Sequence, residues 1–268
     1  MVSDYSGIFK GAYKPEPPKT GFFYAYEHLR DGLKYFIGEK AGWLPEYRHI
    51  EDWLKDNHGK GLLCLGNYGR GKSVICRWIL PIILNSRTFT DACRVMSAYE
   101  LGRGEEPNWG RQWMVVDDIG VERETVSYGV KCVPLNEVVD TAEQYRRGLI
   151  LTSNLTTGEL ESKYGKRTMD RLRDIMHLVT FSGESMRGKD GGGFPDRPRA
   201  YGVDFKTWAE AEAFRSEQDR FYQGIANGTM RVTDKDRMEV DEHQPLLLCK
   251  GWLGAMFKRD YEAIEKAK

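Results

Sequence analysis

The sequence predicts an α/β fold with a largely parallel sheet. Three patterns support this prediction: short apolar runs of strand length, amphipathic stripes between them, and a glycine-rich loop that joins one apolar run to a helical segment. Apolar strands that alternate with helices are typical of a sheet covered by helices on both faces. We expect this core to span 46–188, between an N-terminal arm and helix (1–45) and a glycine-rich linker with a partly helical tail (189–268).

Several apolar runs have the length of buried strands. They are 61–65, 94–96, 112–116, 149–152 and the alternating run 177–182. Segments between them repeat apolar residues every three or four positions, the period of a helix with one buried face. Helices are predicted over 74–80, 135–145, 157–165, 169–176 and 208–221. Thr156 and Glu159 form a capping-box pattern for the third of these helices, and Gly148 is expected to end the second.

The N-terminal part contains one further amphipathic helix. Its apolar positions Phe23, Tyr26, Leu29, Leu33 and Phe36 recur at three and four residues, the spacing of one helix face. Such a face can pack on the main domain or bind a partner, and the pattern leaves both interpretations open. The preceding proline-rich segment 14–19 is predicted to be an extended linker or docking arm.

The glycine-rich loop has the pattern of a phosphate-binding loop (P-loop). It consists of Gly66, Asn67, Tyr68, Gly69, Arg70, Gly71, Lys72 and Ser73. Glycines allow successive backbone N–H groups to surround an anion, and the next helix presents its positive N-terminal end. In such loops the lysine reaches the β- and γ-phosphates, and the serine hydroxyl binds Mg²⁺. The sequence therefore predicts a site for ATP or ADP with Mg²⁺ in a P-loop NTPase.

Polar residues follow two other predicted strands. Asp117 comes where the strand 112–116 ends, placed to hold Mg²⁺ directly or through water, and Asp118 is a candidate to polarise the attacking water. Asn154 follows the strand 149–152 and can hydrogen-bond a γ-phosphate oxygen or orient water. Each of these residues alone also fits an ordinary loop or turn. Their combination with the phosphate loop predicts nucleotide hydrolysis.

Positive charges concentrate between 163 and 189. The residues are Lys163, Lys166, Arg167, Arg171, Arg173, Arg187 and Lys189, opposed by Asp170, Asp174 and Glu184. Arginines in such a segment can neutralise charge on a neighbouring subunit's ATP as fingers. They can also contact DNA phosphates or be ordinary solvated helix charges.

The composition limits the partners and the location. Lys plus Arg and Asp plus Glu number 40 each, so the net charge is zero and nucleic-acid binding requires a local basic face. The five cysteines are scattered without C-x-x-C spacing, which favours buried thiols in a reducing, cytoplasmic location. The start of the sequence lacks the pattern of a signal peptide, and no apolar stretch is long enough for a membrane span.

The motifs together resemble the DnaC/IstB family of AAA+ ATPases, which comprises bacterial helicase loaders and transposition helpers. The resemblance covers 55–187. It rests on Gly66-x-x-Gly-x-Gly-Lys72-Ser73, Val115-Val-Asp-Asp-Ile-Gly120, Leu151-Thr-Ser-Asn-Leu155, Gly165-Lys-Arg-Thr-Met-Asp-Arg-Leu172 and Gly183-Glu-Ser-Met-Arg187. The last two blocks make the resemblance specific, because generic phosphate-loop proteins lack them in this order.

The resemblance implies a role for each residue around the nucleotide. Lys72 and Ser73 bind phosphate and Mg²⁺, Asp117 is the acidic metal-site residue, and Asp118 stands at the catalytic acidic position. Many AAA+ members have Glu at that last position. A carboxylate that is one methylene shorter is expected to slow hydrolysis and to favour a binding switch.

Three further residues match positions that respond to the γ-phosphate. Asn154 resembles the first sensor, and Arg187 resembles the second sensor, which contacts ATP within its own subunit. Arg171 resembles the finger inserted into the adjacent subunit's site, with Arg167 as the alternative. Such ATPases assemble as open rings or spirals, so the resemblance implies a homo-oligomer whose monomer hydrolyses ATP poorly.

The partner is left open by these motifs. The leading hypothesis is a loader that places a replicative DNA helicase on single-stranded DNA through backbone contacts. A transposition helper that recruits a transposase to DNA fits the same motifs, and a non-hydrolysing nucleotide-bound adaptor fits the short carboxylate of Asp118. The segment 95–112, where DNA-contacting helices of this family often lie, is short. Residues 1–45 and 189–268 match no motif of the family, so the partner-specific surface is expected there.

Overall fold

A computed structural model describes residues 15–86, 92–107, 109–122, 125–127, 130–200, 203–229, 237–239, 246–249 and 254–257. Its centre is a five-stranded parallel sheet in the order β2-β3-β6-β1-β7. The strands are β1 (Gly61–Gly66), β2 (Cys93–Ser97), β3 (Trp113–Ile119), β6 (Gly148–Ser153) and β7 (Met176–Phe181). The predicted fold class is confirmed. Residues 1–14 of the predicted N-terminal arm, and much of the tail after 229, lie outside the described residues.

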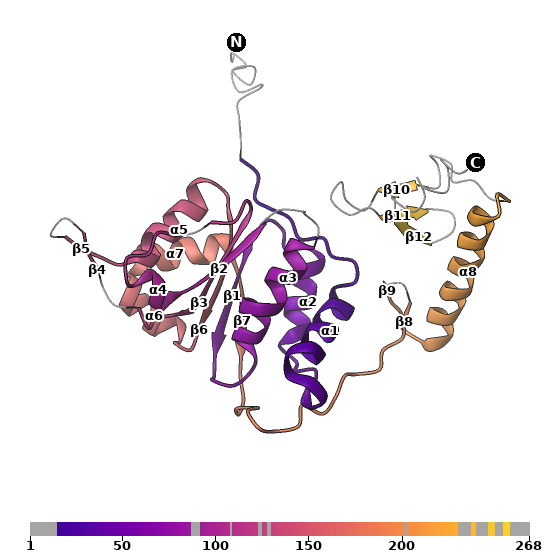
Figure 1. Cartoon of the computed structure of the whole chain (residues 1–268), viewed down its shortest axis with the longest axis horizontal. Coiled ribbons are helices and arrows are strands. Elements are labelled where there is room, and N and C mark those ends of the chain that lie inside the picture. Colours follow the sequence, from indigo (N-terminus) through magenta and orange to yellow (C-terminus); the bar gives the residue numbers. More distant parts are fainter. Residues whose placement is uncertain are drawn as a thin grey trace, which may run out of the picture.

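Helices cover both faces of the sheet (Figure 1). One face carries α1 (Ala25–Ile37), the short 3₁₀ turn η2 (Gly38–Lys40), α2 (Tyr47–Lys55), the π-helical segment η3 (Val74–Ile79) and α3 (Leu80–Asn85). The other face carries α4 (Ala98–Leu101), α5 (Pro134–Gln144), α6 (Thr157–Tyr164) and α7 (Lys166–Ile175). A small hairpin, β4 (Thr125–Ser127) with β5 (Val130–Cys132), projects beyond this second layer (Figure 1).

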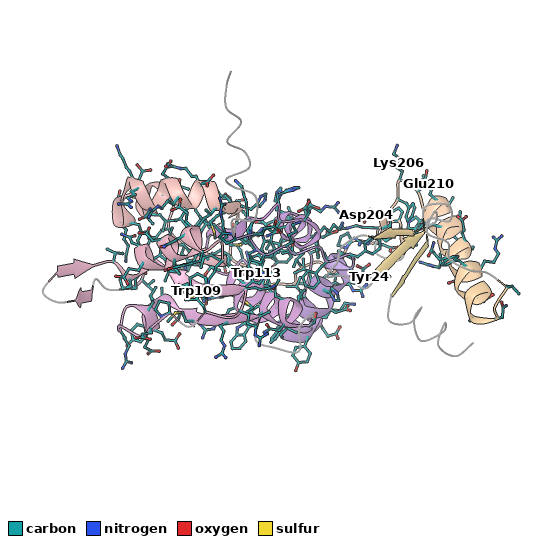
Figure 2. All side chains as sticks on the ribbon, turned by 90° about the horizontal axis from the view of Figure 1, so that it is seen from above. Tyr24, Trp109, Trp113, Asp204, Lys206 and Glu210 are labelled. Carbon is teal, nitrogen blue, oxygen red and sulfur yellow. The ribbon has the colours of Figure 1, made fainter. Side chains whose placement is uncertain are left out.

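The side chains of β1 show how the sheet serves two cores. Leu62 and Cys64 belong to the hydrophobic cluster under α1 and α2, whereas Leu63 and Leu65 belong to the cluster under α5, α6 and α7. Successive side chains of a strand point to opposite faces, so a strand between two helical layers is apolar at every position. Trp113 at the start of β3 lies among the densely packed side chains of the main body (Figure 2).

The first amphipathic helix packs on the core. Leu29 and Leu33 of α1 are fully buried in the same cluster as β1. A Cβ added to Gly32 would lie only 2.7 Å from Cγ2 of Ile79, so α1 approaches η3 closely. Of the two interpretations of this helix, the structure shows packing on the main domain. Its last turn nevertheless exposes Tyr35.

Several boundaries differ from the predictions. Gly148 does not end a helix: α5 ends at Gln144, and Gly148 begins β6, where a Cβ would lie 2.2 Å from the Trp113 ring. The strand β3 continues through Asp117 and Asp118 instead of ending before them. The helix α2 and the single turn α4 have no counterpart among the predictions. The predicted capping box is present, because Thr156 and Glu159 bond each other's backbone N–H groups.

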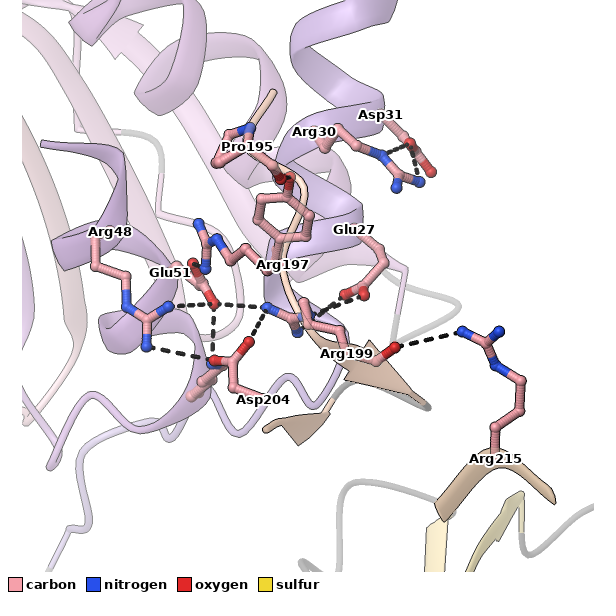
Figure 3. A network of polar contacts seen from close by, with 12 residues as sticks. Glu27, Arg30, Asp31, Arg48, Glu51, Pro195, Arg197, Arg199, Asp204 and Arg215 are labelled. Carbon is pink, nitrogen blue, oxygen red and sulfur yellow. Dashed lines mark hydrogen bonds and ion pairs between the residues drawn. The ribbon is translucent and has the colours of Figure 1, made fainter. Parts of the chain in front are cut away.

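After β7 the chain returns along α1 and α2 (Figure 3). The fully buried carboxylate of Glu51 accepts hydrogen bonds from Arg197 (2.9 Å) and Arg199 (3.0 Å) and pairs with Lys55 (2.9 Å). Tyr26 of α1 donates a hydrogen bond to the carbonyl of Pro195 (2.9 Å). These contacts hold residues 195–199, which follow the glycine-rich linker, against α1 and α2.

The C-terminal part lies at the far end of the molecule, where Figure 2 labels Asp204, Lys206 and Glu210. It contains the small hairpin β8 (Arg199–Ala200) with β9 (Val203–Asp204), the helix α8 (Trp208–Ala226) and an antiparallel sheet of β10 (Arg237–Glu239), β11 (Leu246–Cys249) and β12 (Gly254–Phe257). Across the ranges that the structure describes, no helix combines the length and the apolar character that crossing a bilayer requires.

Candidate nucleotide site

A cavity of about 710 Å³ lies at the carboxyl edge of the sheet, the edge where β1, β3 and β6 end. The predicted site residues that line it are Tyr68, Gly69, Arg70, Gly71, Lys72, Ser73, Asp117, Asp118, Asn154 and Arg187. Gly66 and Asn67 do not line it, but their carbonyl oxygens accept hydrogen bonds from Lys72. Arg167 and Arg171 are not part of this cavity. The structure therefore brings the loop, the two aspartates and the two sensor candidates, Asn154 and Arg187, together and leaves the two finger candidates outside.

The phosphate loop joins β1 to η3, and residues of β7 and α2 pack closely against two of its glycines. Gly66 has φ +118° and Gly71 has φ +88°, backbone values that residues with a Cβ rarely adopt. A Cβ on Gly66 would lie 2.0 Å from the carbonyl oxygen of Phe181, and one on Gly71 would lie 2.4 Å from the Tyr47 hydroxyl. These positions require glycine because neighbouring elements press against the loop.

The Lys72 amine lies at the centre of the site. It donates hydrogen bonds to the carbonyl oxygens of Gly66 (2.7 Å) and Asn67 (2.8 Å) and to Oδ1 of Asn154 (2.8 Å). Burial lowers the pKa of this amine, and the nearby carboxylates of Asp118 and Asp117 act in the opposite direction. The lysine is thus a buried cation whose three donors are all used within the chain.

The two aspartates both face the cavity although they are adjacent in a strand. Regular strands point neighbouring side chains to opposite faces. Here the pairing of β3 with β6 shifts register between Val116 and Ile119, and Asp118 has φ +61°, in the left-handed region. A local irregularity of this kind re-aims a side chain, and it lets Asp118 join Asp117 at the same site.

Hydrogen bonds connect the aspartates to β6. The Thr152 hydroxyl donates to Oδ1 of Asp117 (2.6 Å) and accepts from the backbone N–H of Asp118 (2.8 Å). Asn154 donates from Nδ2 to Oδ1 of Asp118 (2.7 Å). Burial and the neighbouring Asp117 raise the pKa of Asp118, and the bond from Asn154 opposes this. Lys72, Asn154 and Asp118 therefore form one continuous hydrogen-bonded chain. The protein has an α/β fold whose parallel sheet carries a P-loop sequence directly after β1.

Solved structures that are similar to the chain include proteins of DNA replication. A protein proposed to be a primosome component of Streptococcus pyogenes serotype M3 is 18% identical, over 60% of this chain and 79% of that chain, with a TM-score of 0.38. DnaI is 17% identical over 47% and 72%, with a TM-score of 0.36. AMPPCP-bound DnaA from Aquifex aeolicus is 15% identical over 74% of each chain, with a TM-score of 0.37. No family model and no curated protein sequence matches the chain.

The residues expected to hold Mg²⁺ fit that ion. Ser73 and Asp117 supply a hydroxyl and a carboxylate to the same cavity, and Mg²⁺ prefers oxygen ligands. Nη1 of Arg77 lies 3.7 Å from Oδ2 of Asp117. Within the described ranges no three His, Cys, Asp or Glu residues cluster as a metal site.

Several residues of the site were not predicted from the sequence. Glu46, before α2, accepts hydrogen bonds from Arg70 (2.6 Å) and from the backbone N–H of Ser182 (3.0 Å). Tyr47 donates to the carbonyl of Arg70 (3.2 Å). These contacts join residues far apart in sequence, so no local signal points to them. Thr152 could have been suspected from the sequence, because it lies two residues before Asn154 at the end of the same predicted strand.

The block after β7 forms one wall of the cavity. The backbone N–H of Met186 donates to the carbonyl of Gly69 (2.9 Å), and Arg187 lines the cavity. The glycine-rich linker continues this wall, because Gly191 donates to the carbonyl of Lys40 (3.0 Å). Arg187 therefore lines the same cavity as the phosphate loop of its own chain.

The two finger candidates on α7 have different surroundings. Arg171 pairs with Asp140 and with Glu143 (2.8 Å), both on α5. Arg167 is exposed, and the described part of the chain offers its side chain no hydrogen bond or ion pair. Of the two guanidinium groups, only that of Arg167 is available to another molecule without breaking an internal ion pair.

Proposed function

We propose that this protein is an ATP-binding and ATP-hydrolysing switch of the AAA+ type. One observation carries the proposal: Lys72 of the phosphate loop, Asn154 at the end of β6 and Asp118 at the end of β3 form a single hydrogen-bonded chain. Each residue comes from a different motif, and a glycine-rich surface turn has no need of the other two. Through this hydrogen-bonded chain, phosphates bound at Lys72 can change the position of Asp118, the residue that polarises the attacking water.

Each residue has a distinct task in this proposal. The loop N–H groups and Lys72 hold the β- and γ-phosphates. Ser73 and Asp117 would hold Mg²⁺, which when bound would supply neutralising charge to the phosphates. Asp118 polarises the attacking water, and Asn154 orients the Asp118 carboxylate. Because Asp118 is short and bonded to Asn154, we expect slow turnover in the isolated subunit.

The finger that completes the site comes from a second copy of this chain. We assign it to Arg167, which is exposed and unpaired among the described residues, in preference to Arg171, which α5 already holds. A cation that reaches the γ-phosphate from outside stabilises the charge of the transition state. Hydrolysis then depends on assembly of the homo-oligomer.

The partner that we propose is a replicative DNA helicase, loaded onto single-stranded DNA. Support comes from the ordered motif blocks, which resemble those of helicase loaders. Copurification of a hexameric helicase with the ATP-bound protein is the expected result. ATP-dependent coating of duplex DNA without a helicase would instead indicate a transposition helper, and absence of turnover with intact ATP binding would indicate an adaptor.

Turnover per subunit across a range of protein concentrations tests the proposal. We expect turnover to rise with concentration in the wild type and to fall at least about tenfold in Arg167→Ala at high concentration. Arg173→Ala is the matched control, because Arg173 is an exposed α7 arginine that pairs with Glu161 of its own chain. If wild-type turnover does not depend on protein concentration, or if both variants lose turnover equally, the proposal that a second subunit completes the ATP site is wrong.

A further inference from the structure

A second pocket lies at the amino edge of the sheet, the edge where β3 and β6 begin. Its volume is about 350 Å³, within the general size range of ligand cavities. The lining residues are Pro15, Glu16, Pro18, Arg111, Gln112, Tyr145, Arg146 and Arg147. Arg111 comes just before β3, and Arg147 just before β6. Three arginines thus share one pocket with a single carboxylate, that of Glu16.

Within the part of the chain that the structure describes, no hydrogen bond or ion pair engages the three arginine side chains. Neither Arg111 nor Arg146 makes a side-chain hydrogen bond or ion pair with any residue in the described ranges. The guanidinium of Arg147 lies 5.4 Å from the ring centroid of Trp109, a cation–π contact that leaves its N–H donors unused. Elsewhere in the protein, arginines such as Arg48 and Arg171 pair with carboxylates. Like charges in one pocket repel each other, and an external anion would offset that repulsion.

The backbone at Arg146 has an ordinary cause. Its φ is +51°, the left-handed conformation common just after a helix C-cap, and the Arg147 backbone N–H donates to the carbonyl of Ala142 (3.0 Å) to close the end of α5. Arginines after the C-terminal end of α5 are favoured by the helix dipole, which is an ordinary reason for Arg146 and Arg147. It does not account for Arg111, which belongs to a different element and faces the same pocket.

We propose that this arginine pocket binds the phosphate backbone of a single-stranded nucleic acid. Guanidinium groups bind phosphate oxygens through two parallel hydrogen bonds. Tyr145 also lines the pocket with 57% of its surface exposed, and exposed aromatic rings stack on unpaired bases. An acidic peptide would use the arginines but not the ring, so the combination favours nucleic acid.

The pocket is separate from the nucleotide cavity. The two lie at opposite edges of a parallel sheet and share no lining residue. The inference therefore adds a place for the DNA contact of the proposed function without depending on ATP binding. Loss of one activity leaves the other measurable.

Fluorescence anisotropy with a fluorescein-labelled oligothymidylate, in the absence of nucleotide, tests the inference on the full chain. The variant is the triple substitution Arg111→Ala, Arg146→Ala and Arg147→Ala. We expect at least about a tenfold loss of affinity and a decrease of about two in the slope of log affinity against log salt, since each lost phosphate contact on a single strand contributes about 0.7. The single variant Tyr145→Ala should weaken binding without changing the salt slope.

The matched control removes the same charge elsewhere. It carries Arg30→Ala, Lys206→Ala and Arg215→Ala, all outside the pocket, and should bind the oligonucleotide like the wild type. Thermal melting and binding of a fluorescent ATP analogue check that both triple variants are folded. Wild-type oligonucleotide affinity in the pocket variant, or equal losses in the two triples, would overturn the inference. Binding of polyglutamate in place of the oligonucleotide would overturn it too, by assigning the pocket to an acidic protein segment.

Discussion

The two edges of the parallel sheet carry charge in opposite ways. At the carboxyl edge, Lys72, Asp117 and Asp118 all have partners within the chain, and Lys72 and Asp117 are almost fully buried. At the amino edge, Arg111 and Arg146 are exposed and unpaired among the described residues. Partnered, buried charges are held in fixed positions, as chemistry requires. Exposed arginines without an internal partner in the described ranges can bind an external anion without first breaking an internal bond. The comparison contrasts charges that are paired within the chain with charges whose donors are unused there.

The largest effect is expected for Asp118→Asn, which keeps the shape of the carboxyl edge and removes the charge. Turnover of the oligomer should fall at least about 100-fold, the range of a lost general base. Affinity for the ATP analogue should change little, because the phosphates are held by the loop and Lys72. Turnover is measured by phosphate release. Unchanged turnover would mean that Asp118 is only a structural partner of Asn154 and would break the comparison.

The next largest effect is expected for Glu51. Its buried carboxylate is paired within the chain but lines neither the nucleotide cavity nor the arginine pocket. Glu51→Gln should destabilise the protein by about 3 kcal/mol, because it leaves buried guanidinium groups without their carboxylate. Urea unfolding at neutral pH measures the change. Glu212→Gln is the control: Glu212 pairs with Arg215 on an exposed part of α8, and such pairs contribute little. Equal stability of the two variants would contradict the role of internal partners.

The same carboxylate predicts a pH dependence. Burial alone raises the pKa of Glu51, but hydrogen bonds and charges of Lys55 and Arg197 outweigh it, so the pKa lies below the ordinary value. The unfolded chain therefore takes up this proton at a higher pH than the folded chain. The stabilisation is complete above the ordinary glutamate pKa and is lost as the pH falls through the lower, folded value. Melting temperatures of Glu51→Gln should show a smaller acid-side decline than those of the wild type.

The smallest effect is expected beside the carboxyl edge. The Tyr164 hydroxyl donates a hydrogen bond to the buried carboxylate of Glu122, which also accepts from the backbone N–H of Gly120 (2.7 Å). Tyr164→Phe removes one of these bonds and should cost about 1–2 kcal/mol. Because Glu122 keeps a second donor, ATP affinity should stay within error. A large loss of ATP binding would show that the loop after β3 is part of the nucleotide site.

The sequence predicts the parts of this protein whose chemistry is local. The phosphate loop occupies contiguous residues, and Asp117 and Asn154 lie at or just after the ends of apolar runs, so the carboxyl edge of the parallel sheet places them at the same cavity. Glu46 and Tyr47 escaped prediction because their contacts with Arg70 span more than a helix and a strand of intervening chain. Gly148 was wrongly predicted to end a helix. The Trp113 ring packs so close to it that only glycine fits, and the sequence alone does not distinguish this cause from a helix end. The arginine pocket is likewise assembled from separate elements, and only the fold reveals it.

Titration with a fluorescent ATP analogue and Mg²⁺ tests the central claim most directly. Saturable binding is predicted for the wild type and for Arg111→Ala, which alters only the amino edge. Lys72→Ala should bind at least about 100-fold more weakly, the loss expected when charge-assisted hydrogen bonds to phosphate are removed. A wild-type protein that does not bind the analogue, or a Lys72→Ala variant that binds it equally well, would contradict the assignment of the carboxyl edge as the nucleotide site.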